Sequence, residues 1–195
     1  MDTLEGKAPQ VRANGISSYA DFDMLACLAQ TERAAASTRL ERYPALHFAN
    51  SIWKNNSAEI MAQPQTSQAS FDAVMEFARQ IRMVPLPVRK EKAGYLLNSM
   101  LIPMLFSAMD LYVNGISDPE SIDKAWALGT GAPMGPFRIL DTIGLTTADN
   151  IVKQYLKVPS FLAPYNFRGM HAMLQTYLTA GKLGMSFGEG FYKYA

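Results

Sequence analysis

The sequence predicts an α+β fold that is mainly α-helical. Before about residue 92, short apolar stretches flank one segment with helical periodicity, which is the pattern of a strand–helix–strand portion of an α/β sheet. After Gly94, the apolar spacing becomes that of successive helices. We therefore expect a partial α/β domain over residues 1–92 and an all-helical domain over residues 93–195.

The first domain should begin with a loop over residues 1–19, which contain glycine, proline, asparagine and serine. A helix is expected from Asp21, a possible N-cap, to about residue 37. Pro85 and Pro87 have no backbone N–H to donate, so the strand that contains them should lie at a sheet edge. The predicted strands cover residues 45–48, 58–61 and 83–88, and the predicted helix between them covers residues 70–82.

The second domain should start with a long apolar helix over residues 95–114, which Pro103 would kink. Asp118 and Pro119 have the residue types of an N-cap and a first helical position, so they should open the next helix. Further helices are predicted over residues 137–143, 147–156 and 168–179.

Composition excludes several classes of function. Hydrophobic residues make up 49% and charged residues 18% of the 195, which suits a globular core. A formal net charge of +1 offers no electrostatic reason to expect a nucleic acid or a membrane surface as a partner. Cys27 is the single cysteine, so neither an internal disulfide nor a cysteine-based zinc cluster is expected, and no metal site is predicted. We take the cytoplasm as the simplest compartment, since no signal-peptide pattern occurs.

Three residues have the chemistry of an oxidoreductase site: His47, Glu59 and Asn98. An imidazole can accept a hydroxyl proton near neutral pH while a cofactor accepts a hydride, and a carboxylate can orient that imidazole. Taken singly, each residue has an ordinary interpretation as a structural histidine, a surface carboxylate or a helix cap. His171 is interpreted as a packing residue, and Lys54 as a solvated surface lysine.

Five strings in order resemble the 3-hydroxyacyl-CoA dehydrogenase family, especially its short 3-hydroxybutyryl-CoA type. They are Arg42-Tyr43-Pro44-Ala45-Leu46-His47-Phe48-Ala49-Asn50, Ile52-Trp53-Lys54-Asn55-Asn56, Gly94-Tyr95-Leu96-Leu97-Asn98, Pro133-Met134-Gly135-Pro136-Phe137 and Gly188-Glu189-Gly190-Phe191-Tyr192. The resemblance implies a Rossmann-type domain that binds NAD, followed by a helical domain that contacts acyl-CoA and forms a homodimer. The reaction it implies is the reversible oxidation of a 3-hydroxyacyl-CoA to the 3-ketoacyl-CoA.

By position, the resemblance implies that His47 is the general base and Glu59 its partner carboxylate. It also implies that Asn98 binds substrate and that Asn50 contacts the cofactor. The reaction would then lie in a cleft between the two domains, because Asn98 belongs to the helical domain and the dyad to the other.

The sequence departs from the family pattern at its start. No Gly-x-Gly-x-x-Gly occurs anywhere in the chain, and the acidic residue that should bind the ribose is missing. We therefore expect a Rossmann remnant, truncated at the N-terminus, that binds NAD weakly. The alternative to a crippled dehydrogenase is a non-catalytic dimerisation or acyl-CoA-binding module derived from the same family.

Overall fold

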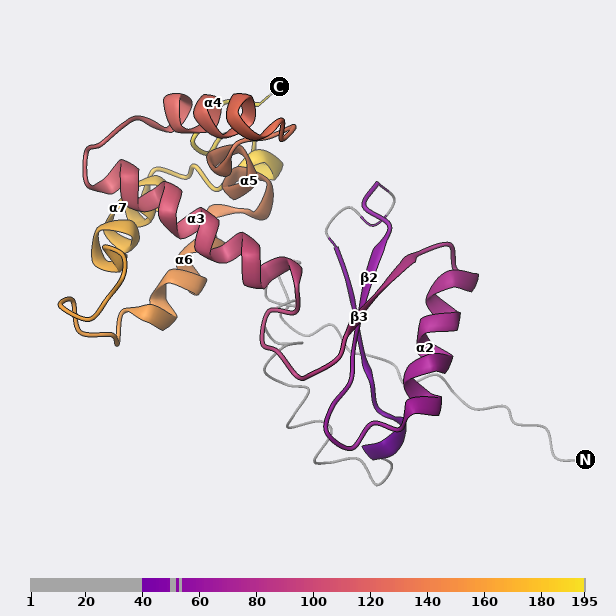
Figure 1. The fold of residues 1–195 in the computed structure, drawn as a ribbon. Coiled ribbons are helices and arrows are strands. Elements are labelled where there is room, and N and C mark those ends of the chain that lie inside the picture. Colours follow the sequence, from indigo (N-terminus) through magenta and orange to yellow (C-terminus); the bar gives the residue numbers. More distant parts are fainter. Residues whose placement is uncertain (1–39, 50–51, 53, 195) are drawn as a thin grey trace, which may run out of the picture.

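The computed structural model describes residues 40–49, 52 and 54–194, which form a small sheet unit and a larger helical unit (Figure 1). The predicted loop over residues 1–19, the helix from Asp21, Cys27 and Asn50 all lie outside the described residues. None of the described helices combines the length and the apolar character needed to cross a membrane.

Within the described residues, three short strands form one sheet in the order β1-β2-β3. β1 (Ala45–Phe48) pairs antiparallel with β2 (Ser57–Met61), and β2 pairs parallel with β3 (Val84–Val88). Helix α2 (Gln68–Gln80) joins the parallel pair, which confirms the predicted strand–helix–strand unit. A 3-10 helix, η1 (Leu40–Arg42), precedes the sheet.

The antiparallel pairing of β1 and β2 follows from their short connection. Segment 49–56 joins the two strands, whereas a parallel crossover needs about a dozen residues or more. In the resulting register His47 lies directly opposite Glu59. Directly opposite residues of paired strands project from the same face, so this register brings the two side chains together.

β3 is the last strand of the described order, as its two prolines predict. Helix α2 begins two residues earlier than predicted, because Ser67 is its N-cap and accepts the Ser70 N–H at 3.2 Å. The helix ends before Arg82, whose φ of 61° lies in the left-handed region. Ala78 of α2 packs on Ala58 and Ile60 of β2, and all three side chains are fully buried.

Five helices form the second unit. Their bounds are α3 (Leu97–Val113), α4 (Pro119–Thr130), α5 (Pro136–Ile143), α6 (Leu145–Tyr155) and α7 (Phe167–Thr179), with a 3-10 helix η2 (Met185–Phe187) after them. Asp118 caps α4 by accepting the Ser121 N–H at 2.9 Å, as predicted. Each helix lies within about two residues of its predicted range. The shared core includes Phe106, Phe137 and Leu174.

Helix α3 connects the two units, and its first turn is the end nearest the sheet (Figure 1). It starts at Leu97 rather than at Tyr95, because Gly94 and Tyr95 have positive φ values of 83° and 51°. This left-handed pair turns the chain sharply between β3 and the helix. Leu105, Phe106, Ala108 and Met109 bury one side of α3 against the helices that follow.

Candidate functional site

The centre of the candidate site is a contact between His47 in β1 and Glu59 in β2. His47 Nδ1 lies 2.9 Å from Glu59 Oε2. The two residues are only 5% and 3% exposed. Burying a carboxylate is costly unless its oxygens accept good hydrogen bonds, so the remaining partners of Glu59 decide whether this arrangement is stable.

Glu59 receives those hydrogen bonds from helix α3. Its Oε1 accepts the backbone N–H groups of Leu96 and Leu97, each at 2.9 Å. Leu96 is the N-cap residue of α3 and has no side-chain cap of its own, so Glu59 caps the helix from the sheet. The positive end of the helix dipole stabilises a carboxylate placed there. One side chain therefore links the histidine, the sheet and the helical unit.

Tyr95 completes the surroundings of the histidine. Its ring stacks on the imidazole of His47 with a centroid distance of 4.5 Å and an interplanar angle of 15°. Tyr95 is fully buried and packs with Ala45, Met61 and Val88 of the sheet. Tyr95 belongs to one of the motifs found in the sequence, but the sequence analysis gave it no role. Its residue type alone does not show what the ring stacks on, because the left-handed turn sets the direction of the side chain.

This arrangement can perform acid–base chemistry at one nitrogen atom. A carboxylate only accepts hydrogen bonds, so the proton shared with Glu59 belongs to His47 Nδ1. Nε2 is then the ring nitrogen that can exchange a proton with a substrate. The negative charge of Glu59 stabilises the imidazolium formed when Nε2 accepts a proton. Among the described residues, no group of three or more histidine, cysteine or acidic side chains is arranged to hold a metal ion.

Asn98 is the second residue of α3 and is half-buried. The helix-cap interpretation of Asn98 is wrong, because Leu96 occupies the N-cap and the Glu59 side chain supplies the cap hydrogen bonds. Asn98 therefore sits in the first turn of α3, immediately after the residues that Glu59 holds. Its predicted substrate contact stays a prediction, and so does the cofactor contact of Asn50, which lies outside the described residues.

His171, interpreted as a packing residue, takes part in a polar network of the helical unit. Its Nδ1 lies 2.6 Å from Asp149 Oδ1, and the second Asp149 oxygen accepts from Gln175 at 2.7 Å and from Lys153 at 2.7 Å. Asp149 is 1% exposed, so this network joins α6 to α7 through a buried carboxylate. The pair lies in the helical unit, whereas His47 and Glu59 lie in the sheet.

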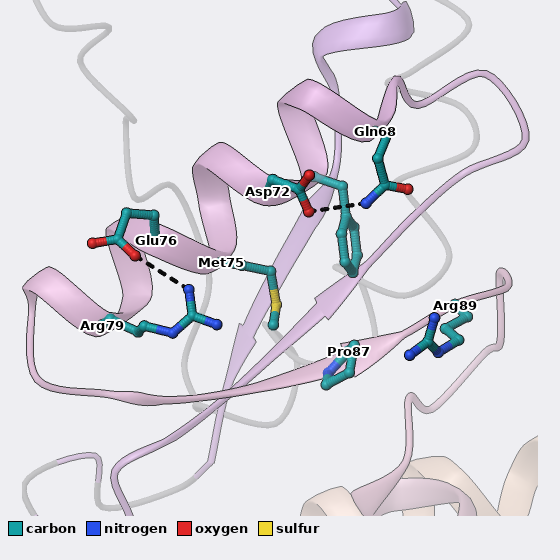
Figure 2. Close-up of a pocket in the computed structure, with 8 residues that line it drawn as sticks. Gln68, Asp72, Met75, Glu76, Arg79, Pro87 and Arg89 are labelled. Carbon is teal, nitrogen blue, oxygen red and sulfur yellow. Dashed lines mark hydrogen bonds and ion pairs between the residues drawn. The ribbon is translucent and has the colours of Figure 1, made fainter.

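A hollow in the sheet unit lies away from the dyad. It measures about 500 Å³ and opens between α2 and β3 (Figure 2). Figure 2 shows Gln68 paired with Asp72 and Glu76 paired with Arg79 along α2, while Arg89 lies near Pro87, just past the end of β3. None of its lining residues belongs to the dyad, so the hollow does not mark the candidate site.

The described residues do not fit the pyrophosphate of a dinucleotide. Such a site needs a glycine-rich turn between a strand and a helix N-terminus. The turn that leads from β2 to α2 covers residues 62–67 and contains no glycine, and the Ser67 hydroxyl there is occupied by the Ser70 N–H. The described part of the sheet thus supplies the dyad and not the dinucleotide cradle.

Comparison with known proteins identifies the family. A family model for the C-terminal domain of 3-hydroxyacyl-CoA dehydrogenase matches residues 94–194, more than half of the chain. The chain belongs to the 3-hydroxyacyl-CoA dehydrogenase family. A second model of the same family, its NAD binding domain, matches residues 26–92. The two matches meet where the sheet unit gives way to helix α3.

Among related 3-hydroxyacyl-CoA dehydrogenases, the human mitochondrial hydroxyacyl-coenzyme A dehydrogenase is 35% identical over 164 residues, which cover 84% of this chain and 51% of the relative. The 3-hydroxybutyryl-CoA dehydrogenase of Clostridioides difficile is 32% identical over 167 residues, covering 86% of this chain and 58% of the relative. The chain therefore spans about half the length of the curated relatives it matches.

Solved structures agree in fold. A diketoreductase that acts on dicarbonyl compounds is 40% identical, has a TM-score of 0.76 and covers 92% of this chain and 68% of its own. The (S)-3-hydroxybutyryl-CoA dehydrogenase of Ralstonia eutropha is 31% identical, with a TM-score of 0.71, covering 85% of this chain and 56% of its own. The Rossmann remnant followed by a helical domain is thus the family's architecture.

Proposed function

We propose that this chain carries the acid–base part of a 3-hydroxyacyl-CoA dehydrogenase, which interconverts a short-chain 3-hydroxyacyl-CoA and the 3-ketoacyl-CoA in fatty-acid metabolism. One observation carries the proposal, namely the buried contact between His47 Nδ1 and Glu59 Oε2 at 2.9 Å. The family match and the relatives named above supply the substrate class.

The proton follows a short path in this proposal. During oxidation, neutral His47 accepts the C3-hydroxyl proton at Nε2, while Glu59 stabilises the resulting imidazolium. During reduction, the same imidazolium returns that proton to the C3 oxygen. NAD is the two-electron partner that we propose for the whole enzyme, on the basis of the family's NAD binding domain. Asn98, in the adjoining turn of α3, is proposed to bind the substrate, and Asn50 to contact the cofactor.

Assembly and organisation enter the proposal by family resemblance. We propose division into residues 1–92 and 93–195, a homodimer formed through the helical domain, and a cytoplasmic location. The two-fold dimer is the commonest arrangement among soluble oligomers. The exposed apolar side chains of the helical unit, Ile116 at 69% and Leu128 at 86%, support an interface there.

A second substrate class is favoured by the diketoreductase similarity of 40% identity. A dicarbonyl compound without CoA presents the same ketone to His47, so the dyad alone does not separate the two classes. Rates with acetoacetyl-CoA and with ethyl acetoacetate, which shares the 3-keto group but lacks CoA, distinguish them. A preference of tenfold or more in kcat/KM for the thioester, about 1.4 kcal/mol, supports acyl-CoA, whereas the reverse order assigns the chain to free dicarbonyl substrates.

The central test is the loss of activity on substitution of His47. NADH oxidation by acetoacetyl-CoA is followed with millimolar NADH, because we expect weak dinucleotide binding. His47→Gln keeps a polar side chain but removes the base, and kcat should fall by about 100- to 10,000-fold. His171→Gln is the matched control, since it removes the only other histidine and should leave kcat unchanged.

Two outcomes would contradict the proposal. Equal turnover in His47→Gln and in the unaltered chain would remove His47 from the reaction. Acetoacetyl-CoA binding by calorimetry without any turnover in the unaltered chain would favour the non-catalytic acyl-CoA-binding module instead.

A further inference from the structure

Residues 94–97, the turn that leads into α3, hold both members of the dyad. Leu96 and Leu97 donate their backbone N–H groups to Glu59 Oε1 at 2.9 Å. Tyr95, between them and Gly94, lays its ring against the His47 imidazole, 4.5 Å between centroids and 15° from parallel. This one turn therefore contacts the Glu59 carboxylate through its backbone N–H groups and the His47 imidazole through the Tyr95 side chain.

The backbone at Tyr95 is unusual for a bulky residue. Its φ of 51° lies in the left-handed region, which disfavours any residue with a Cβ. The turn is held by a hydrogen bond from Tyr95 N to Lys92 O at 3.1 Å and by one from the Ser99 hydroxyl to Tyr95 O. Backbone strain of this kind gathers at functional sites, where the surrounding structure enforces it. Here the strained conformation is what points the ring at His47.

We propose that Tyr95 is a positioning residue that holds the imidazole plane of His47 and favours its protonated form through the face of its ring. The face of an aromatic ring carries negative charge density, and a cation within about 6 Å of the centroid is attracted to it. The centroid distance of 4.5 Å between the rings of Tyr95 and His47 is inside that range. The attraction is strongest where water is excluded, and both rings are buried.

Two groups that contact the imidazole act in the same direction. Glu59 approaches from β2 at Nδ1, and Tyr95 approaches from the turn before α3. Each favours the imidazolium over the neutral ring, the first through a full charge and the second through a quadrupole. The catalytic consequence rests on the proposed function, since it requires that His47 exchange a proton with the substrate.

The competing interpretation is that Tyr95 only fills the small core with Ala45, Met61 and Val88. The two interpretations differ in what a substitution does. A packing role needs volume alone, so Tyr95→Leu and Tyr95→Phe would change stability and leave the dyad's titration as it is. A positioning role needs an aromatic face, so Phe should substitute for Tyr and Leu should not.

The experiment compares Tyr95→Phe, Tyr95→Leu and the control Phe167→Leu, which removes a ring from the buried core of the helical unit. Tyr95→Leu should lower kcat by about 3- to 30-fold with little change in KM, as expected for the loss of a desolvated cation–ring contact. The acid limb of the pH–rate profile for oxidation should move to lower pH by about 0.4 to 1.5 pH units, since the neutral base then persists to lower pH. Tyr95→Phe should stay within about threefold of the unaltered chain, and Phe167→Leu should leave the pH profile in place.

NMR of the two histidine rings gives a readout that needs no turnover, with His47→Gln identifying the His47 signals. The ring current of the stacked aromatic should displace the His47 ring protons in the unaltered chain and in Tyr95→Phe, and Tyr95→Leu should abolish that displacement. The NMR signals of His47 are also followed across pH. The inference would be overturned if Tyr95→Leu changed neither the pH–rate profile nor the pH at which the His47 signals are half-titrated. It would also be overturned if Tyr95→Phe were as impaired as Tyr95→Leu. A chain without turnover that still shows the NMR changes would reject the proposed function and leave Tyr95 as a positioning residue.

Discussion

Glu59 uses its two carboxylate oxygens for two different parts of the protein. Oε2 meets His47 within the sheet, and Oε1 meets two backbone N–H groups of the helical unit. An ionised carboxylate has enough lone pairs for all three hydrogen bonds, while an amide in its place keeps only one oxygen acceptor. The identity of this residue therefore decides both the tautomer of His47 and the start of helix α3.

Glu59→Gln should impair the reaction without abolishing it. The amide oxygen can still accept from Leu96 and Leu97, but an NH₂ group then faces His47 Nδ1 and favours the wrong tautomer. We expect kcat to fall by about 10- to 1,000-fold, less than in His47→Gln, with an altered pH–rate profile because the orienting charge is gone. Glu76→Gln, on the exposed face of α2, is the matched charge control. Steady-state kinetics across pH would contradict this if Glu59→Gln and Glu76→Gln behaved alike.

At the scale of elements, buried aspartates hold the helical unit together. Asp123 accepts the first N–H groups of α5, from Phe137 at 2.7 Å and Arg138 at 3.1 Å, because the N-cap Gly135 has no side chain. Asp141 accepts from Phe191, Tyr192 and the Tyr194 hydroxyl and so fixes the last residues against α5. Burial and the hydrogen bond to the Asp141 carboxylate raise the pKa of Tyr194.

Gly190→Ala should destabilise this arrangement. A Cβ at position 190 would overlap the Asp141 carboxylate, which is buried and held by three donors. We expect a loss of about 1–3 kcal/mol in the free energy of unfolding, typical of overpacking. Gly129→Ala, in α4 with open space around it, should instead be neutral or gain about 0.5–1 kcal/mol. Urea unfolding measures the free energy of unfolding of each variant. Equal values for the two variants would show that the close approach of residue 190 to Asp141 does not restrict the side chain at that position.

At the scale of the whole molecule, the two units have separate cores joined by few groups. The helical core contains residues of α3 to α7, while the sheet has its own clusters with α2 and with Tyr95. Tyr95 and Glu59 thus connect units that the family models also separate, at residues 92 and 94. A reaction centred on His47 would therefore depend on the position of the helical unit relative to the sheet.

Self-association should occur through the exposed apolar side chains of the helical unit. Leu105 is 5% exposed and packs in the chain's own core, so Leu105→Asp should unfold the domain rather than separate subunits. Leu128 is 86% exposed, so Leu128→Asp should keep the fold, as seen by circular dichroism, and weaken association. Light scattering over a range of concentrations tests this. A monodisperse species of 21.6 kDa at high micromolar concentration would rule out the dimer.

The helices and strands were predictable because local periodicity and capping chemistry determine them. Asp118 marks a helix start by its carboxylate group, and Pro85 and Pro87 place β3 at the edge. The start of α3 was predicted two residues early, because the left-handed conformation of Tyr95 depends on its tertiary contacts. A residue in a turn can adopt a strained φ only when the surrounding packing stabilises it.

By itself, the sequence determined the residue types of the candidate dyad, the family and the order of the elements. Only the tertiary structure decided that His47 and Glu59 face each other, since their contact depends on the antiparallel register across a short connection. It also decided that Glu59 caps α3 and that Tyr95 covers the imidazole. These contacts join residues 37 or more positions apart, and side-chain direction over that separation is set by packing, which no local pattern encodes.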